Sequence, residues 1–502
     1  MSQVYSQYSK AKIGWIFGLS AWQVGIVAAS SVPVFYAINQ QAWAAAGLLT
    51  VMAAAVTALT IVPVRGRSAA GWLAAAAGFA FGSLRGWSTF RARATHGAVT
   101  DSDQVDLPGI LAALEIHEGP PSGLGGDRVA IIQHHAMRTW AVTCQVTHPG
   151  LGFTDPHERA GMAAGLAGLI DQAERSELID EILLMVRTVP DDGAERDQWT
   201  AAHRTGAPLP GVRAINDQLQ QALTGASVRT EVFVTFVVPE TRLAKAAKEA
   251  GRGIAARARV MYALMAEVET GLKAGVGASD VTWLTSPQLA AACRTGFAPA
   301  DRISIIDALA AHAAGQNVNA DVPWAMAGPS GADTAARHYS HDAWNSISAT
   351  LTLPIKGATP GALAPILAPA GVGERRCLLI AYRVLPAHRA ARATGTSQWG
   401  ADMGQALRER AGVRSGTKTR DDQAQVAALE AKLARGAAIT TAYAVATVTA
   451  PKTVRLSECG RALDASIRRA GFAPLRLDLA QDAAFAASVI PLGVSLTRAT
   501  ST

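Results

Sequence analysis

Acidic residues are missing from the first 100 positions of this chain of 502 residues. The same stretch holds seven basic residues, Lys10, Lys12, Arg65, Arg67, Arg85, Arg91 and Arg93. They carry the whole formal net charge of +7, because the other 39 of the 46 basic residues balance the 39 acidic ones. A basic excess confined to one end argues against a nucleic-acid-binding domain, so no direct nucleic-acid contact is expected. It favours a lipid bilayer with an anionic inner leaflet as the partner.

Charged residues of either sign are also missing from Ile13 to Val64. This stretch is long enough to cross a bilayer twice, since one span takes about 20 apolar residues. The polar break at residues 39–41 divides it into spans at about 19–38 and 43–64, which predicts a two-helix transmembrane hairpin over residues 1–67. Because basic residues beside short spans mark the cytoplasmic side, we expect a multi-pass protein of the cell inner (plasma) membrane with both termini cytoplasmic. The seven basic residues are the predicted membrane-boundary residues.

A second apolar segment, residues 71–84, has tryptophan and arginine near its ends. Its 14 or so residues are short for a span, so we predict a basic and aromatic interfacial helix within residues 68–100. A third, distorted span remains open as the alternative. It would place the following domain outside the cell.

Signatures of catalysis are absent. Cys144, Cys293, Cys377 and Cys459 lie far apart with no CxxC spacing, which indicates reduced, buried thiols. No GxSxG or HExxH motif occurs, and residues 412–419, the string nearest to a phosphate-binding loop, have the wrong spacing. We therefore predict a non-enzyme with no catalytic, cofactor-binding or metal-binding residues.

Three small groups of polar residues are the alternatives to that prediction. His134–His135, and His338 with His341, are possible metal ligands, but zinc needs four ligands and no cysteine or acid cluster flanks either pair. Asp191–Asp192 resembles a metal site of a membrane-tethered transferase, whereas helix capping explains both acids without chemistry.

Strand and helix patterns alternate after residue 100. Residues 232–238 are β-branched and aromatic throughout, which predicts a strand, and Asp155–Glu158 has the form of a helix-capping box. Further helices are expected at 208–223 and in a charged arm at 387–433. The strand, helix and strand at 439–449, 454–470 and 475–479 repeat the first pattern and are typical of half a ferredoxin-like fold. The predicted fold class is a membrane α-helical hairpin plus cytoplasmic α+β subdomains (101–300 and 301–502) with ferredoxin-like strand-helix-strand units.

Two blocks of sequence resemble known families. The hairpin ending Pro63-Val64-Arg65-Gly66-Arg67 resembles the PrgI family of small conjugation membrane proteins. The remainder resembles the N-terminal, non-motor region of VirB-type conjugation ATPases. The stretches that carry this resemblance are 187–193 (RTVPDDG), the strand and long helix from Val232, and the ending from Tyr443 through Phe485 to Gly493.

The resemblance implies a non-catalytic, membrane-anchored structural subunit of an actinobacterial conjugative (type IV-like) secretion apparatus. Its cytoplasmic domain is expected to dock a separately encoded ATPase within an oligomeric assembly. The alternative is an EccE-like component of a type VII secretion system, which also has two N-terminal spans and a cytoplasmic domain.

Overall fold

The computed structural model describes residues 21–64, 67–97, 99, 101–122, 126–152, 154–203, 206, 209–226, 228–251, 253–352, 361–371, 373–386 and 438–497. The predicted helical arm at 387–433 and the string at 412–419 lie outside these residues.

One antiparallel sheet of thirteen strands organises the described part of the chain. Its main path runs β3 (Thr89–Arg91), β10 (Gly331–Thr334), β11 (Tyr339–His341), β12 (Trp344–Thr352), β14 (Ile439–Pro451), β13 (Arg375–Leu385), β7 (Glu181–Pro190), β8 (Val228–Pro239), β6 (Thr139–Thr147), β5 (Asp127–His134) and β4 (Leu114–Ser122). Two short strands extend it, with β15 (Ala473–Arg476) paired to β12 and β9 (Asp280–Trp283) paired to β6. Residues 232–238 lie within β8, which confirms that strand prediction.

The same order of strands and helices occurs twice in the middle of this sheet. The first copy runs β6, α4 (Pro156–Arg175), β7, β8, α8 (Ile254–Thr270) and β9, and the second runs β12, α12 (Ala364–Leu367), β13, β14, α15 (Leu456–Arg469) and β15. The strands lie in the order β9-β6-β8-β7 in the first copy and β15-β12-β14-β13 in the second. The copies meet where β7 pairs with β13, from Thr188↔Arg376 to Glu181↔Arg383.

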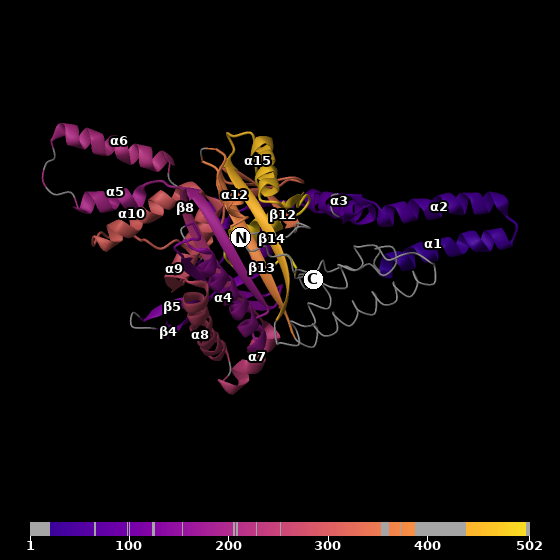
Figure 1. Cartoon of the computed structure of the whole chain (residues 1–502), viewed down its shortest axis with the longest axis horizontal. Helices are drawn as coiled ribbons and strands as arrows, with labels where there is room; N and C mark the ends of the chain where they lie inside the picture. The colour runs from indigo at the N-terminus through magenta and orange to yellow at the C-terminus, as the bar shows by residue number, and fades with distance from the viewer. Residues whose placement is uncertain are drawn as a thin grey trace.

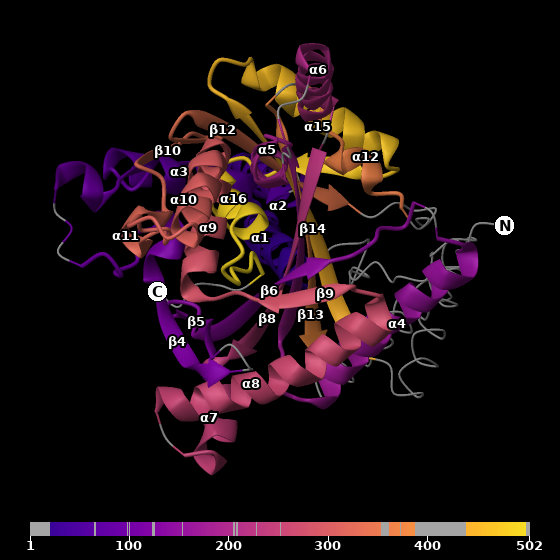
Figure 2. The ribbon, with the colours of Figure 1, turned by 90° about the vertical axis from the view of Figure 1, so that its left-hand side faces the viewer.

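Helices cover both faces of the sheet. On one face α4 and α8 pack on the first copy, and α12 and α15 pack on the second. On the other face lie α9 (Ser286–Phe297), α16 (Gln481–Val489) and α11 (Trp324–Ala327), and Phe297 and Phe485 are 5.4 Å apart between ring centroids. Figure 2 shows α9 and α16 next to each other. The capping box predicted at Asp155 is confirmed, with Glu158 at its third helical position.

The remaining elements are short or peripheral. They are β1 (Pro63–Val64), β2 (Arg67–Ser68), α5 (Ala194–His203), α6 (Pro210–Ala226), α7 (Glu240–Glu249), α10 (Arg302–Ala313), the 3₁₀ turns η1 (Arg93–His96), η2 (Gly109–Ala113) and η4 (Pro299–Asp301), and the π-helical turn η3 (Gly271–Val276).

A helical arm projects from the sheet at one end of the long axis (Figure 1). It consists of α1 (Ala21–Asn39), α2 (Trp43–Ile61) and α3 (Ala69–Leu84), with α1 and α2 side by side. Among the described residues only α2 is long and apolar enough to cross a membrane. Within the described residues, the other two apolar helical stretches, Gly25–Asn39 in α1 and Ala69–Leu84 in α3, are shorter than a span requires.

This finding corrects two predictions. The multi-pass inner-membrane localisation is wrong, because one helix rather than two meets the requirements of a span. The predicted fold class is also wrong, because only one described helix meets the requirements of a span and the strands form one large continuous antiparallel sheet. The strand-helix-strand units of that prediction are present as the two copies described above. The described part of α1 also carries polar side chains: Gln23 donates to the Thr60 carbonyl (3.0 Å), and Ser30 and Ser31 donate to the Val27 carbonyl (both 2.9 Å).

Candidate functional site

Two helices, α5 and α6, are inserted between the adjacent strands β7 and β8 and project from the sheet. Figure 1 shows them at the end of the molecule opposite the α1–α2 arm. Two side-chain hydrogen bonds fix the insertion. The amide of Gln220 on α6 donates to Thr200 Oγ1 on α5 (3.3 Å), and the amide of Gln198 on α5 donates to Asp307 Oδ1 on α10 (3.1 Å).

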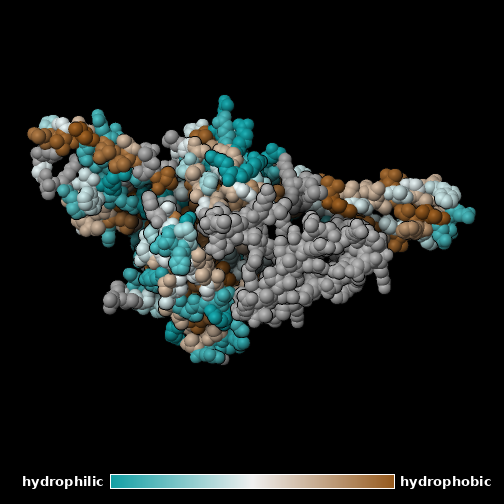
Figure 3. Space-filling model, viewed as in Figure 1, coloured by the Kyte–Doolittle hydropathy of each residue, from teal (hydrophilic) through white to brown (hydrophobic). Residues whose placement is uncertain are grey.

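The amphipathic helix α6 has the reverse of the usual orientation. An amphipathic helix normally packs its apolar stripe on the protein and turns its polar side to water. In α6 the polar Asn216 and Gln220 are half-buried, while the apolar residues face outward. These residues form what we call the α6 apolar face: Leu209 (75% exposed), Val212 (56%), Ile215 (69%), Leu219 (55%) and Leu223 (42%). Figure 3 shows this hydrophobic surface over α6.

An exposed aromatic side chain extends this surface on α5. Trp199 is 63% exposed and stacks on His203, with 4.3 Å between the ring centroids. The Nδ1 atom of His203 lies 2.8 Å from the Trp199 carbonyl, within hydrogen-bond distance. Tryptophan is the residue type most enriched among the side chains that dominate binding at protein interfaces. Trp199 and the α6 apolar face together are therefore the candidate functional site.

Ion pairs hold the base of this insertion. The Asp192 carboxylate accepts from the Ala194 amide (3.1 Å) at the start of α5, and both its oxygens accept from Arg302 Nη1 (2.6 and 2.7 Å). Asp191 accepts from the Gly193 amide (3.1 Å) and pairs with Arg196 (3.3 Å). Both acids are thus occupied by backbone amides and arginines, which agrees with helix capping and leaves the transferase metal site without support.

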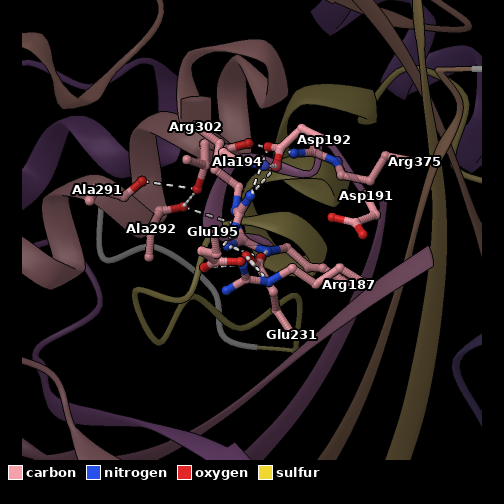
Figure 4. Close-up of polar contacts among 12 residues, drawn as sticks. Arg187, Asp191, Asp192, Ala194, Glu195, Glu231, Ala291, Ala292, Arg302 and Arg375 are labelled. Carbon is pink, nitrogen blue, oxygen red and sulfur yellow. Dashed lines mark hydrogen bonds and ion pairs between the residues drawn. The ribbon is translucent and has the colours of Figure 1, made fainter. Parts of the chain in front are cut away.

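A chain of alternating charges leads from this base into the sheet. Arg302 Nη2 lies 2.6 Å from Glu195, and Arg229 donates to both Glu195 oxygens (2.5 and 2.6 Å). Arg229 is also 3.9 Å from Glu231, which pairs with the fully buried Arg187 at 2.7 Å. Figure 4 shows Arg302 near Asp192 and Glu195, and Arg187 beside Glu231. The insertion is therefore fixed electrostatically to the centre of the sheet.

Two buried arginines neutralise the carboxyl ends of the helices on that face. Arg187 Nη1 donates to the carbonyls of Ala292 in α9 (2.9 Å) and Val489 in α16 (3.3 Å). Arg375 Nη1 donates to the Thr295 carbonyl of α9 (2.6 Å), and burial lowers the pKa of Arg375 to about 10, so it stays charged at neutral pH. A cation at a helix C-terminus interacts favourably with the helix dipole, so these arginines have a structural role.

Three of the seven predicted membrane-boundary residues, Arg85, Arg91 and Arg93, lie at the junction between the arm and the sheet. Lys10, Lys12 and Arg65 are outside the described residues, and Arg67 is in β2. Arg85 follows α3 and lies over the Phe81 ring, 4.6 Å from its centroid. Arg91 in β3 pairs with Asp333 (3.0 Å), and Arg93 in η1 lies 3.6 Å from Asp106. Arg91 and Arg93 thus connect the junction to the body, and their role at a membrane stays a prediction.

The histidine candidates are not brought together as a metal site. His134 Nε2 is within hydrogen-bond distance of the Ile110 carbonyl (3.0 Å), and burial lowers the pKa of His134. His341 lies between the Phe297 carbonyl (2.7 Å) and Ser346 Oγ (2.8 Å), and burial, then Arg375, lower its pKa to about 3. Within the described ranges no three His, Cys, Asp or Glu residues are grouped so that they could hold a metal ion.

The cysteines are buried free thiols, as predicted. Burial raises the pKa of Cys144 to about 12 and also raises the pKa of Cys293. Because the thiolate is the nucleophile, such thiols are inert at neutral pH. The geometry around them offers no chemistry.

No family model matches the chain, and no curated protein matches its sequence. The function is therefore inferred from the site itself. The sequence predicted the helix at 208–223 but not that its apolar residues face outward. The available signal was the spacing of Val212, Ile215, Leu219 and Leu223, which places them on one face.

Proposed function

We propose that this protein is a non-catalytic structural subunit of an actinobacterial conjugative (type IV-like) secretion apparatus and that it docks a separately encoded ATPase. The observation that carries the proposal is the outward orientation of the α6 apolar face on an insertion with an ion-paired base. A helix that presents its apolar side is the partner of a hydrophobic groove, one of the recurring modes of protein recognition. The docking surface on the ATPase is therefore an apolar groove.

The exposed area of the α6 apolar face determines how much its burial can contribute to the free energy of binding. Burying a Val, Leu or Ile side chain completely stabilises a complex by about 1.5–3 kcal/mol, and the five side chains of the face are between 42% and 75% exposed. Their burial contributes roughly 5 kcal/mol, which is comparable to the cost of association at its lower limit, about 4 kcal/mol. Trp199 and further contacts must therefore contribute to a stable complex.

Attachment to a bilayer is the second part of the proposal, and it concerns helix α2. This helix has 19 residues and a mean hydropathy of 2.0 over its most apolar window, and only Ala46 and Thr60 are buried. Figure 3 shows hydrophobic surface along the arm. An exposed helix of this composition has a favourable environment in lipid.

Paired charge substitutions on α6 test the docking. Replacing Ile215 and Leu219 by Glu places two charges in the apolar face. The control replaces Gln218 and Gln221 by Glu, which adds the same charge to exposed polar positions of the same helix. We expect the full-length control to co-purify with the proposed ATPase, and the Ile215→Glu/Leu219→Glu variant to lose at least tenfold in affinity, the equivalent of about 1.4 kcal/mol.

If both variants retained the ATPase equally, α6 would not be the docking surface. The thermal unfolding midpoints of the two variants should match, since all four positions are exposed. The purified protein should hydrolyse no ATP alone. Intrinsic hydrolysis that disappears in the Lys418→Ala variant would contradict the non-catalytic part of the proposal.

A further inference from the structure

A small cavity lies between the start of α16, the turn after α3 and the strands β10 and β11. Its volume is about 80 Å³, whereas one water molecule needs only about 10–15 Å³ in such a measure. The cavity therefore has room for a group of several heavy atoms. Neither the α6 docking surface nor the ion-paired base contributes to its lining.

Aromatic rings make up much of the cavity wall. The five rings belong to Trp87, Phe90, Phe297, Tyr339 and Phe485. Phe485 is central, with ring centroids 5.4 Å from Phe297 and 5.1 Å from Tyr339. The faces of such rings carry negative partial charge and attract cations, and groups of aromatic rings bind quaternary ammonium and methylated lysine in this way.

Two polar side chains in the wall have unused binding capacity. Asp482, near the start of α16, forms no ion pair with any residue that the structure describes, and burial raises the pKa of its carboxyl group. The side chain of Tyr339 is almost fully buried, at 3% exposure, and its hydroxyl group forms no hydrogen bond to a described residue. Burial raises the pKa of Tyr339 as well, so the hydroxyl keeps its proton and can donate.

Among the described residues no cation pairs with Asp482 in this apolar environment. The backbone amides of Asp482 and Ala483 and the positive end of the α16 dipole compensate part of its charge, but a helix N-terminus contributes only about 0.3–1 kcal/mol. Burying a carboxylate without a partner costs considerably more. We propose that the cavity binds the head group of a small organic cation, an alkylammonium or alkylguanidinium, with Asp482 as the counter-ion and the aromatic rings as the wall.

The position of the cavity gives this binding a structural effect. Trp87, Ser88, Thr89 and Phe90 of its wall connect α3 of the arm to β3 at the edge of the sheet. A ligand that contacts both this connection and α16 adds a link between the arm and the body. Hydrogen exchange at residues 86–91 should therefore slow when the cavity is filled.

Matched cationic and neutral probes test the proposal on the full-length chain by titration calorimetry. Methylguanidinium is compared with methylurea, its neutral counterpart of similar shape, at concentrations up to about 10 mM. A capped Ala-Arg-Ala peptide is compared with its citrulline analogue, to distinguish a free small cation from an arginine side chain of a polypeptide. We expect methylguanidinium to bind and methylurea not to bind, and the tighter of the two cationic probes identifies the source of the ligand.

Three variants locate the binding. Asp482→Asn should weaken binding at least tenfold, since a hydrogen bond to a charged group contributes about 1.5–3 kcal/mol, and Tyr339→Phe should weaken it about fivefold. Asp127→Asn, which removes the same charge from an exposed position outside the cavity, should leave binding unchanged. The absence of binding by both cationic probes, or equal binding to wild type and Asp482→Asn, would overturn the proposal. If Asp482→Asn does not fold, unchanged binding to Tyr339→Phe has the same consequence.

Discussion

Arg187 offers the sharpest test of how the sheet is stabilised. The Arg187→Met substitution keeps the aliphatic volume in the core but removes a guanidinium group that is almost fully buried. It leaves the Glu231 carboxylate buried without its nearest cation and removes the hydrogen bonds that Arg187 Nη1 donates to the Ala292 and Val489 carbonyls. Removing one partner of a buried ion pair costs about 3–5 kcal/mol, because the other charge remains uncompensated.

The two lost hydrogen bonds to helix carbonyls add about 1 kcal/mol each. We therefore expect Arg187→Met to lower the free energy of unfolding by about 5–7 kcal/mol, half or more of the stability of a typical domain. The Arg187→Met/Glu231→Gln double variant should recover about 2–3 kcal/mol of this loss, since it replaces the stranded charge by a neutral amide.

The assay is urea unfolding of the full-length protein, followed by circular dichroism. The single variant Glu231→Gln completes the double-mutant cycle. A loss below about 2 kcal/mol in Arg187→Met would refute the reasoning, because it would mean that water or a neighbouring cation replaces the guanidinium. A double variant no more stable than Arg187→Met would show instead that the lost carbonyl contacts, rather than the charge on Glu231, dominate.

Two further predictions concern packing and pH. A Cβ atom added at Gly165 in α4 would lie 2.0 Å from the Gly275 carbonyl oxygen, so Gly165→Ala should destabilise the protein by at least about 1–3 kcal/mol in urea unfolding. Gly168→Ala in the same helix, where nothing lies within 4 Å, should instead be neutral or stabilise by up to about 1 kcal/mol. His341 has its pKa lowered to about 3, so between pH 6.5 and pH 3 the unfolded state binds a proton that the folded state does not. Stability should therefore fall with decreasing pH in that window, by up to about 1.4 kcal/mol per unit, and His341→Gln should reduce this slope in melting curves measured at pH 7 and pH 5. An unchanged slope would contradict the assignment of the effect to His341.

Local signals in the sequence predicted local elements well. The β-branched run at 232–238 lies within β8, and Asp155 caps α4 with Glu158, because each signal depends on residues only a few positions apart. The multi-pass prediction depended on the absence of charge over Ile13 to Val64, whereas among the described residues only α2 is both long and apolar enough to span a membrane.

Long-range features could not be predicted in the same way. The repeat of a strand-helix-strand unit near the C-terminus was visible in the sequence, but the pairing of β7 with β13 joins residues almost 200 positions apart. Spacing placed the apolar residues of α6 on one face, yet only its packing against α5 through Gln220 shows which face points outward. The cavity combines side chains from residues 87 to 486, and no sequence motif joins them.

The two apolar surfaces of the molecule, the α1–α2 arm and α6, lie at opposite ends of its long axis (Figure 1). Between them runs a single sheet whose hydrogen-bonded ladders resist stretching and bending far better than a flexible linker would. The protein is therefore a rigid spacer between these two apolar surfaces. In the proposed assembly the sheet would set the distance between the partner of α6 and the arm, and a longer or shorter loop elsewhere in the chain would leave that distance unchanged.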